Sequence, residues 1–267
     1  MLPVDRCAVS PQTAISDQGY RKNSVTQEKF PIGQDQGEEP LRRDSLQQQI
    51  YDRLRHSLVS GAYRPGETLS SRGLAERLGV SAMPVREALT RLTAEGALEP
   101  TSSRTLRVRV LTAADFDELT AIRLSLEPMA ALRAAEQARA IERKAAAKCY
   151  AALHRAAESG AVDGYLIANA EFHRVIYAAA GWPILSGAIE RLWMIVGPSI
   201  RACVPDARHI AVSMQAHDAA LVALKARDGI ALSDAITSDI KVAASDIRVY
   251  LEVAGAETDL QAGESTQ

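Results

Sequence analysis

Arginines at exposed positions of one short helix give the chain its first chemical signal. Arg86 and Arg91 fall off the apolar stripe of a helix that is predicted to follow Ser81. An exposed guanidinium can bind phosphate, or it can donate two parallel hydrogen bonds to the edge of a guanine. This chemistry requires neighbouring elements that hold the helix against a nucleic acid.

The elements around these arginines are two short amphipathic helices joined by a Gly-Val-Ser turn. Ser70 or Ser71 can cap the first helix, and Gly79 ends it because glycine tolerates the positive φ of a tight turn. Ser81 caps the second helix, and Pro84 lies in its first turn, where the missing N–H costs nothing. The pattern predicts a helix-turn-helix, whose second helix enters the DNA major groove with its N-terminus first.

Flanking segments extend this prediction on both sides. Upstream, Ile50, Leu54 and Leu58 mark a leading helix. Downstream, residues 98–100 leave the second helix and residues 105–110 alternate between apolar and polar side chains like a strand. A strand pair after the recognition helix indicates a β-wing.

Residues 45–110 closely resemble the winged helix of the GntR family of bacterial transcription regulators. The resemblance rests on the runs GAYRPGETL at 61–69, LAERLGVS at 74–81 and PVREALTRLTAEG at 84–96. It implies a DNA-facing side formed by Arg72, Ser81, Pro84, Arg86 and Arg104.

Each of these residues has an expected partner on DNA. Arg72 and Ser81 are expected to meet phosphate, and Arg86 a guanine edge. Arg104 lies at the predicted wing tip, where phosphate or the minor groove is in reach. The chain departs from the family pattern at Ala82, where an arginine is common, and at Met83 beside it. The wing tip also lacks the usual glycine, so we expect an operator that differs from the family's common one.

Composition separates a basic segment from an acidic remainder. Twelve arginines and seven acidic residues give residues 41–110 a charge of +5, while the rest of the chain carries −7. This asymmetry suits phosphate binding by one domain, although +5 alone is also within ordinary surface variation. The three cysteines are too widely spaced for a disulfide framework or a zinc motif, and no stretch is long and apolar enough to span a membrane. We therefore expect a cytoplasmic protein.

The expected fold is mainly α. A disordered tail at 1–40 precedes the winged helix-turn-helix domain at 41–111, and an all-α bundle at 112–255 leads to a second disordered tail at 256–267. Six or seven bundle helices are predicted, separated by breaks such as Ser-Gly and Gly-Trp-Pro. The predicted helix spans are 113–139, with a break near Pro128 as an alternative, then 141–159, 162–180, 182–203, 208–227 and 229–253.

The bundle resembles the FCD ligand-binding domain of the FadR subfamily. The resemblance rests on R-x-x-x-E-P from Arg123, on the segment that ends in Phe-His at His173, and on His217 with the D-x-A-L-x-A-L run after it. It implies a divalent metal, most often zinc, at the centre of the bundle and a small carboxylate effector beside it. The positions that match the family's metal ligands are Asn169, His173, His217 and Asp239.

Two of these four positions depart from the family pattern of one Asp and three His. Asn169 stands where the family has Asp, and Asp239 stands where it has the third His. The formal charge of the four side chains is unchanged, as expected of a site whose carboxylate has moved. The alternative is a metal-free set in which His173 and His217 bond to Asn169 and Asp239. Arg123 matches an effector-binding arginine, with an intrahelical pair to Glu127 as its alternative.

The sequence thus predicts a ligand-responsive DNA-binding transcription regulator and not an enzyme. We expect a homodimer that binds a pseudo-palindromic operator and represses until a small organic acid binds. Two alternatives use other features of the bundle: a metal-dependent enzyme at the His, Asn and Asp cluster, and a DNA-binding regulator whose bundle is purely structural.

Overall fold

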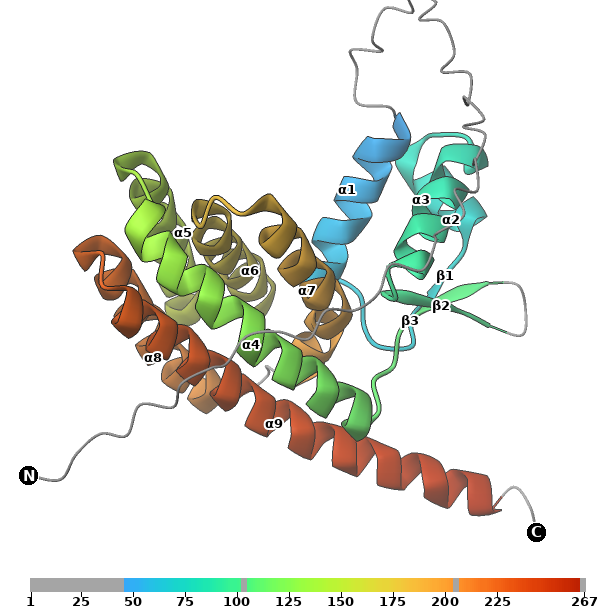
Figure 1. Cartoon of the computed structure of the whole chain (residues 1–267). Helices are drawn as coiled ribbons and strands as arrows, with labels where there is room; N and C mark the ends of the chain where they lie inside the picture. The colour runs from blue at the N-terminus through green and yellow to red at the C-terminus, as the bar shows by residue number, and fades with distance from the viewer. Residues whose placement is uncertain (1–45, 102–104, 204–206, 265–267) are drawn as a thin grey trace, which may run out of the picture. The chain divides into compact units, whose positions relative to one another are not determined.

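Helices make up most of the described chain, which in this computed structural model comprises residues 46–101, 105–203 and 207–264. The N-terminal part, here called the head, contains three short helices and three short strands (Figure 1). In order they are α1 Leu46–Val59, β1 Thr68–Leu69, α2 Ser71–Leu78, α3 Ala82–Ala94, β2 Leu98–Pro100 and β3 Leu106–Val108.

Longer helices follow and form the second part, here called the bundle. In the described residues they are α4 Ala113–Gln137, α5 Ala140–Ser159, α6 Val162–Ala179, α7 Pro183–Cys203, α8 Ala207–Ala226 and α9 Gly229–Glu264. The predicted fold class, a winged head before an all-α bundle, is confirmed. Arg104 and the predicted tail at 1–40 lie outside the described residues.

Capping interactions explain where α2 and α3 begin and end. Ser70 is the N-cap of α2, and its hydroxyl accepts a hydrogen bond of 3.1 Å from the backbone N–H of Gly73. Gly79 ends α2 at a φ of 66°, in the left-handed region that favours glycine. Ser81 is the N-cap residue of α3, but its side chain makes no capping hydrogen bond, so that part of the prediction is wrong.

The head has its own core beneath the helix-turn-helix. The apolar stripe of α3 is fully buried and consists of Val85, Ala88, Leu89 and Leu92. It packs with Leu54 and Leu58 of α1, as the apolar spacing predicts. Arg91 stays on the head, because its guanidinium lies 3.7 Å from the centre of the Tyr51 ring and pairs with Glu95 at 3.1 Å.

The predicted wing is present, with one strand more than expected. The strands β2 and β3 pair antiparallel, with Leu98 opposite Val108. The extra strand β1 pairs with the other edge of β3, with Thr68 opposite Arg107, so the order in the sheet is β1-β3-β2. A two-residue strand is too short to show the alternation by which strands are recognised in a sequence.

The helix α4 begins at a complete capping box and runs on without a break. The Thr112 hydroxyl accepts from the Asp115 backbone N–H, and the Asp115 carboxylate accepts from the Thr112 backbone N–H, as the spacing of the two residues predicts. Pro128 lies inside the helix, so the alternative of a break there is wrong. Buried residues on both sides of it, Glu127 and Ala130, anchor the helix and offset the lost hydrogen bond.

The far end of the chain also differs from the sequence prediction. The helix α9 continues to Glu264, whereas a disordered tail was predicted from residue 256. The segment holds no proline and includes alanine, leucine and glutamate, which favour helix. Figure 1 shows α9 running alongside α4, and these two helices make one of the main contacts of the bundle.

The helix α7 joins the bundle to the head. Trp193 belongs to the bundle core, while its neighbour Met194 is buried in the core of the head. Gly197 lies one turn later, against the last carbonyl groups of α1. Because adjacent residues of one helix belong to different cores, the two parts share a continuous packed contact.

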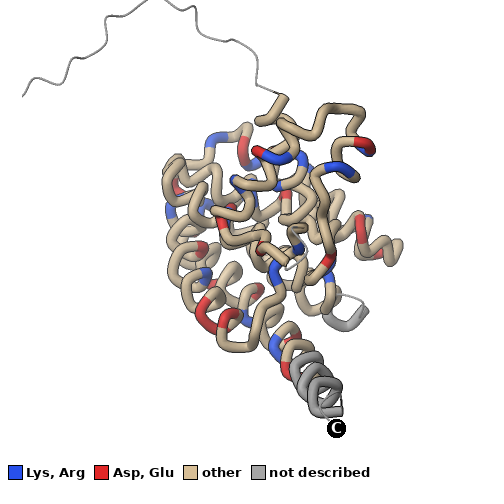
Figure 2. Tube along the Cα trace, turned by 90° about the vertical axis from the view of Figure 1, so that its right-hand side faces the viewer, with Lys and Arg blue, Asp and Glu red and all other residues tan. Residues whose placement is uncertain are grey.

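Charged residues are interspersed along the trace of both parts, with Lys and Arg among Asp and Glu (Figure 2). In the described residues, no helix is both long and apolar enough to cross a membrane. Cys149 and Cys203 are free thiols, as their spacing predicts.

The contact between α1 and α7 can be tested at Gly197. A Cβ at this position would lie 2.3 Å from the Leu58 carbonyl oxygen and 2.7 Å from that of Val59, and both are backbone atoms. We expect Gly197→Ala to lower the free energy of unfolding by about 1–3 kcal/mol, because the two helices must separate. Urea denaturation followed by circular dichroism measures the change. Gly187→Ala on the same helix is the control, since nothing lies within 4 Å of its added Cβ; equal stability of the two variants would contradict the close contact.

Candidate functional site

The exposed face of the helix-turn-helix brings together two of the predicted DNA-binding arginines. The Arg72 side chain is 91% exposed and lies 3.6 Å from Glu76. Arg72 and Arg86 line one hollow of about 260 Å³, together with Thr90 and Thr105, which sequence reasoning missed. The sequence spacing could have identified Thr90, because it follows Arg86 by one helical turn. The Thr90 hydroxyl donates to the Arg86 carbonyl oxygen at 2.8 Å.

The remaining predicted DNA-binding residues lie at the start of α3. Ser81 is exposed, and Pro84 is half-buried in the first turn. Met83 is 65% exposed at the tip of the helix, where an apolar side chain has no core to join. The surface that could meet DNA therefore combines exposed guanidinium and hydroxyl groups with one apolar contact.

A second polar site lies at the centre of the bundle, where side chains of three helices meet. His173 of α6, His217 of α8 and Asp239 of α9 are all buried. The two Nε2 atoms are 3.0 Å apart, and the Asp239 carboxylate lies 3.3 Å from His173 Nε2 and 3.7 Å from His217 Nε2. Their donor atoms converge closely enough to hold one metal ion.

Asn169 is the fourth residue of the predicted set. It precedes His173 by four residues on α6, so the two side chains lie on the same face of that helix. Asn169 is 8% exposed, and its carbonyl oxygen is buried without a hydrogen-bond partner. An orphaned oxygen of this kind is costly unless something binds it.

Hydrogen bonds around the cluster assign the proton positions on His173. The Tyr177 hydroxyl donates to Glu127 Oε2 at 2.5 Å and lies 2.9 Å from His173 Nδ1. Burial, followed by the nearby Glu127 carboxylate, raises the pKa of Tyr177 well above its ordinary value, so the hydroxyl keeps its proton. Since that proton goes to Glu127, the hydroxyl accepts from His173 Nδ1–H, and His173 Nε2 presents a lone pair.

The same reasoning applies to His217. The Ser213 hydroxyl donates to Asp239 Oδ1 at 2.7 Å and lies 3.5 Å from His217 Nδ1, so it accepts from that nitrogen. Two imidazole lone pairs and a carboxylate then face one another, an arrangement that a cation would stabilise. Burial acts to raise the pKa of Asp239, but the neighbouring His217 and His173 rings and the hydrogen bond from Ser213 outweigh it and hold the pKa well below its ordinary value.

Arg123 takes part in this network through Glu127. Its Nε donates to Glu127 Oε1 at 2.5 Å, and the two side chains are 4% and 0% exposed. The intrahelical pair considered as the alternative for Arg123 is therefore present. Its guanidinium also lies 5.0 Å from the centre of the Trp193 ring. A chain of contacts thus runs from Arg123 through Glu127 and Tyr177 to His173.

Sequence reasoning missed Tyr177 and Ser213 and gave Glu127 no role beyond its pair with Arg123. Tyr177 follows His173 by four residues, and Ser213 precedes His217 by four, so each shares a helix face with a predicted ligand. That spacing is a signal that could have found both residues. The contact between Tyr177 and Glu127 spans two helices and leaves no such trace.

Comparison with known proteins matches both parts of the chain. Residues 46–108 match the family described as bacterial regulatory proteins, gntR family, and residues 118–241 match the FCD domain. The transcriptional regulator McbR of Escherichia coli K12 is 32% identical over 190 residues, which cover 70% of this chain and 86% of McbR. The transcriptional repressor RspR of the same strain is 26% identical over 217 residues, which cover 76% and 89% of the two chains.

A solved structure shows the same architecture. The structure of E. coli McbR/YncC is similar to this chain with a TM-score of 0.72 and 30% identity, over 76% of this chain and 97% of that one. The similarity therefore includes the head and the bundle together.

The chain of buried hydrogen bonds predicts the effect of removing one hydroxyl. Tyr177→Phe removes one hydrogen bond to the buried Glu127 carboxylate, which keeps Arg123, and leaves His173 Nδ1–H without its acceptor, so we expect the free energy of unfolding to fall by roughly 1–3 kcal/mol. Tyr150→Phe is the matched control, because the Tyr150 hydroxyl bonds to Asp218 at an exposed position. Chemical denaturation of both variants measures the difference. An equal, small effect of the two substitutions would show that the network is not a stabilising unit.

Proposed function

This chain belongs to the GntR family, and we propose that it is a ligand-responsive repressor that dissociates from its operator when a small organic acid binds in the bundle. Its relatives are transcriptional regulators, so it is a DNA-binding regulator and not an enzyme. The observation that carries the proposal is the convergence of His173, His217 and Asp239 in a bundle that packs against the head. A site for a signal and a site for DNA are thereby joined in one chain.

The DNA-binding roles that we propose for the head residues come from the family resemblance, and the exposure of Arg72, Ser81 and Arg86 supports them. Arg86 on α3 reaches a guanine edge in the major groove, and Arg72 and Ser81 contact phosphate. Pro84 presets the first turn of α3, and Arg104 contacts phosphate or the minor groove. Ala82 supplies no guanine contact, and Met83 offers an apolar one, which favours an operator with a thymine methyl at that position.

Repression and dimerisation are the finer parts of the proposal. The relative RspR is described as a repressor, which supports the same direction of control here. A homodimer presents two heads to a pseudo-palindrome, as winged regulators require. Apolar side chains on the bundle surface support self-association: Met129 is 43% exposed, Trp182 42% and Ile184 90%. DNA binding also supports a cytoplasmic location, and the FCD domain supports the FadR subfamily.

We assign a divalent metal, for which we propose zinc, to Asn169, His173, His217 and Asp239. The residues fit it, because two imidazole nitrogens and one carboxylate are zinc-type donors, and the orphaned Asn169 oxygen is a weaker, neutral fourth ligand. When bound, the metal supplies positive charge for the carboxylate of an effector. Tyr177 and Ser213 orient the two imidazoles from outside, which is the usual role of such partners.

Arg123 is the second group that we assign to the effector. Its guanidinium is already paired with Glu127, so an effector carboxylate must share the guanidinium or displace Glu127. Displacement of Glu127 would also free the Tyr177 hydroxyl and so alter the His173 contact. Binding of an acid would in this way rearrange a network that spans α4 and α6. A metal-free structural bundle is the second candidate, favoured by the direct contacts among His173, His217 and Asp239.

If the head binds DNA as proposed, replacing Arg86 should lower the affinity for DNA. Mobility-shift titration with DNA from upstream of the protein's own gene should give Arg86→Ala a binding free energy weaker by about 1–3 kcal/mol, because a bidentate base contact is lost. Arg155→Ala removes an exposed arginine of α5 and should change nothing. Absence of any shift by the unmodified protein at low salt would refute the DNA-binding role.

If the bundle binds zinc, the metal should raise the free energy of unfolding, which can be measured without an activity assay. Zinc added to chelator-treated protein at 100 times its dissociation constant should raise the free energy of unfolding by about 2.7 kcal/mol. His217→Ala should abolish this gain, and His154→Ala, an exposed histidine of α5, should keep it. Melting curves with and without zinc decide between metal and metal-free bundles. The same curves with small carboxylates, followed by release of bound DNA, identify the effector class.

A further inference from the structure

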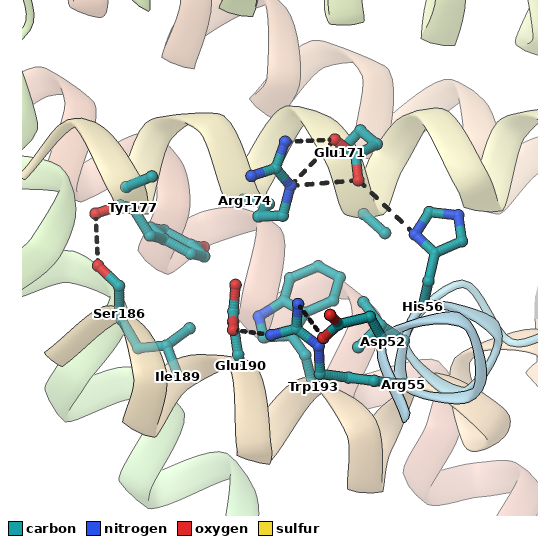
Figure 3. A pocket seen from close by; sticks show the side chains of 13 residues that line it. Asp52, Arg55, His56, Glu171, Arg174, Tyr177, Ser186, Ile189, Glu190 and Trp193 are labelled. Atoms are coloured by element: carbon teal, nitrogen blue, oxygen red, sulfur yellow. Dashed lines mark hydrogen bonds and ion pairs between the residues drawn. The ribbon is translucent and has the colours of Figure 1, made fainter. Parts of the chain in front are cut away.

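A pocket of about 280 Å³ lies between the head and the bundle, outside the buried cluster. Its walls come from α1, α6 and α7, and none of Asn169, His173, His217 or Asp239 lines it. Figure 3 shows Glu171 and Arg174 of α6 across the space from Arg55 and Glu190. This volume is close to the lower limit for metabolite-binding sites in proteins.

Carboxylates outnumber guanidinium groups in the pocket. Asp52, Glu171 and Glu190 face two arginines, Arg55 and Arg174, and the imidazole of His56, whose Nδ1 lies 3.8 Å from Glu171 (Figure 3). Arg174 is engaged by Glu171, through Nε at 3.0 Å and Nη2 at 2.7 Å. Arg55 pairs with Glu190 and lies 3.6 Å from Asp52. An anionic ligand would have to draw an arginine away from its carboxylate in a site with more carboxylates than guanidinium groups. A cation on Glu190 competes with Arg55, which can stay with Asp52, so the carboxylates of the pocket favour the cation.

The remaining wall of the pocket is apolar and aromatic. Trp193 and Tyr177 line it with Ile189, which provides contact for an apolar body and for a cation over an aromatic ring. Trp193 is 5% exposed, and its indole Nε1–H is buried without a hydrogen-bond acceptor. A ligand that carries an acceptor group would remove the cost of this orphaned donor.

We propose that this pocket binds a small organic amine whose apolar body carries a hydrogen-bond acceptor. The ammonium group pairs with Glu190, the apolar body packs on Trp193 and Tyr177, and the acceptor takes the indole N–H. The ligand is opposite in charge to the organic acid assigned to the bundle centre, so the two sites receive different signals.

Glu190 gives this site a direct connection to the head. It belongs to α7, and its partner Arg55 belongs to α1, so their ion pair crosses from bundle to head. An ammonium on Glu190 competes with Arg55 and weakens that link. Trp193 also lies 5.0 Å, centre to centre, from the His173 ring, so the amine and acid sites share one wall. The regulatory consequence, an amine-dependent change in DNA affinity, rests on the proposed function; the binding itself does not.

Calorimetric titration of the full chain tests the binding with three matched probes. Phenylalaninamide is the cation, N-acetylphenylalanine the anion and N-acetylphenylalaninamide the neutral compound, all with the same ring and an acceptor group. Only the cation should bind. Glu190→Gln should weaken it at least roughly tenfold, as expected when a charge-assisted contact is lost. Glu118→Gln, an exposed glutamate of α4 outside the pocket, should bind like the unmodified protein. Equal binding of the anion, or full binding by Glu190→Gln, would overturn the proposal.

A second substitution separates the aromatic wall from the charge. Trp193→Phe keeps an aromatic ring but removes the indole N–H, so the amine should bind several-fold more weakly while the zinc-dependent gain in stability persists. Unchanged affinity for the amine would show that the indole N–H does not bind the ligand. Because zinc lies in another site, chelator-treated and zinc-loaded protein should bind phenylalaninamide equally, and dependence on zinc would assign the amine to the buried cluster instead.

Mobility shifts with added amine test the connection to the head. Phenylalaninamide should change DNA affinity, and Arg55→Gln should shift the affinity in the same direction and no longer respond to the amine. A protein that binds amine but no DNA would refute the proposed function and leave the pocket assignment intact. A protein that binds DNA and is released by an acid, yet gives no heat with amine, would refute the pocket assignment alone.

Discussion

The burial of charged groups inside a bundle rich in alanine is the constraint on which the rest of the structure depends. Arg123, Glu127 and Asp239 are all at most 8% exposed, and a buried charge is tolerated only when it is paired and hydrogen-bonded. The partners come from different helices, since Glu127 of α4 meets Tyr177 of α6, and Asp239 of α9 meets Ser213 of α8. Satisfying these groups fixes the relative positions of four helices, which apolar contacts between alanines alone specify poorly. The polar network that we propose as the signal site is thus also what holds the bundle helices in register.

The helix α7 carries any change in this network toward the DNA. Trp193 contacts the His173 ring and the Arg123 guanidinium, while Met194 next to it fills the core of the head. A helix is stiff over this distance, so rotation or displacement at Trp193 must also move Met194. Such coupling becomes regulation only if the ligand binds one arrangement more tightly than the other. Gly197 makes the contact sensitive, because the backbones of α1 and α7 approach too closely there to slide without separating.

The features that could be predicted from sequence are those that depend on near neighbours in the chain. The Gly79 turn, the box at Thr112 and the buried stripe of α3 depend on spacings of three and four residues, and all three are present. The fold class and the grouping of His173, His217 and Asp239 followed from a family resemblance, which carries tertiary information that spacing lacks. Features set by the packing of distant helices were missed or left open: the strand β1, the Tyr177 to Glu127 contact and the path of α4 through Pro128.

The exchange of Asn169 and Asp239 relative to the family pattern has a structural explanation. A carboxylate on α9 lies within 3.7 Å of both imidazoles and receives the Ser213 hydroxyl, so its charge is compensated where it stands. An additional carboxylate at position 169 would bring a second negative charge to the same face of α6 with no further cation among the cluster residues. Asparagine keeps an oxygen at that position without the charge. The two substitutions are therefore complementary: each would be costly alone, and together they keep one carboxylate beside two imidazoles while moving it from α6 to α9. The proposed effector would therefore meet a neutral amide on α6 where the family pattern has a carboxylate.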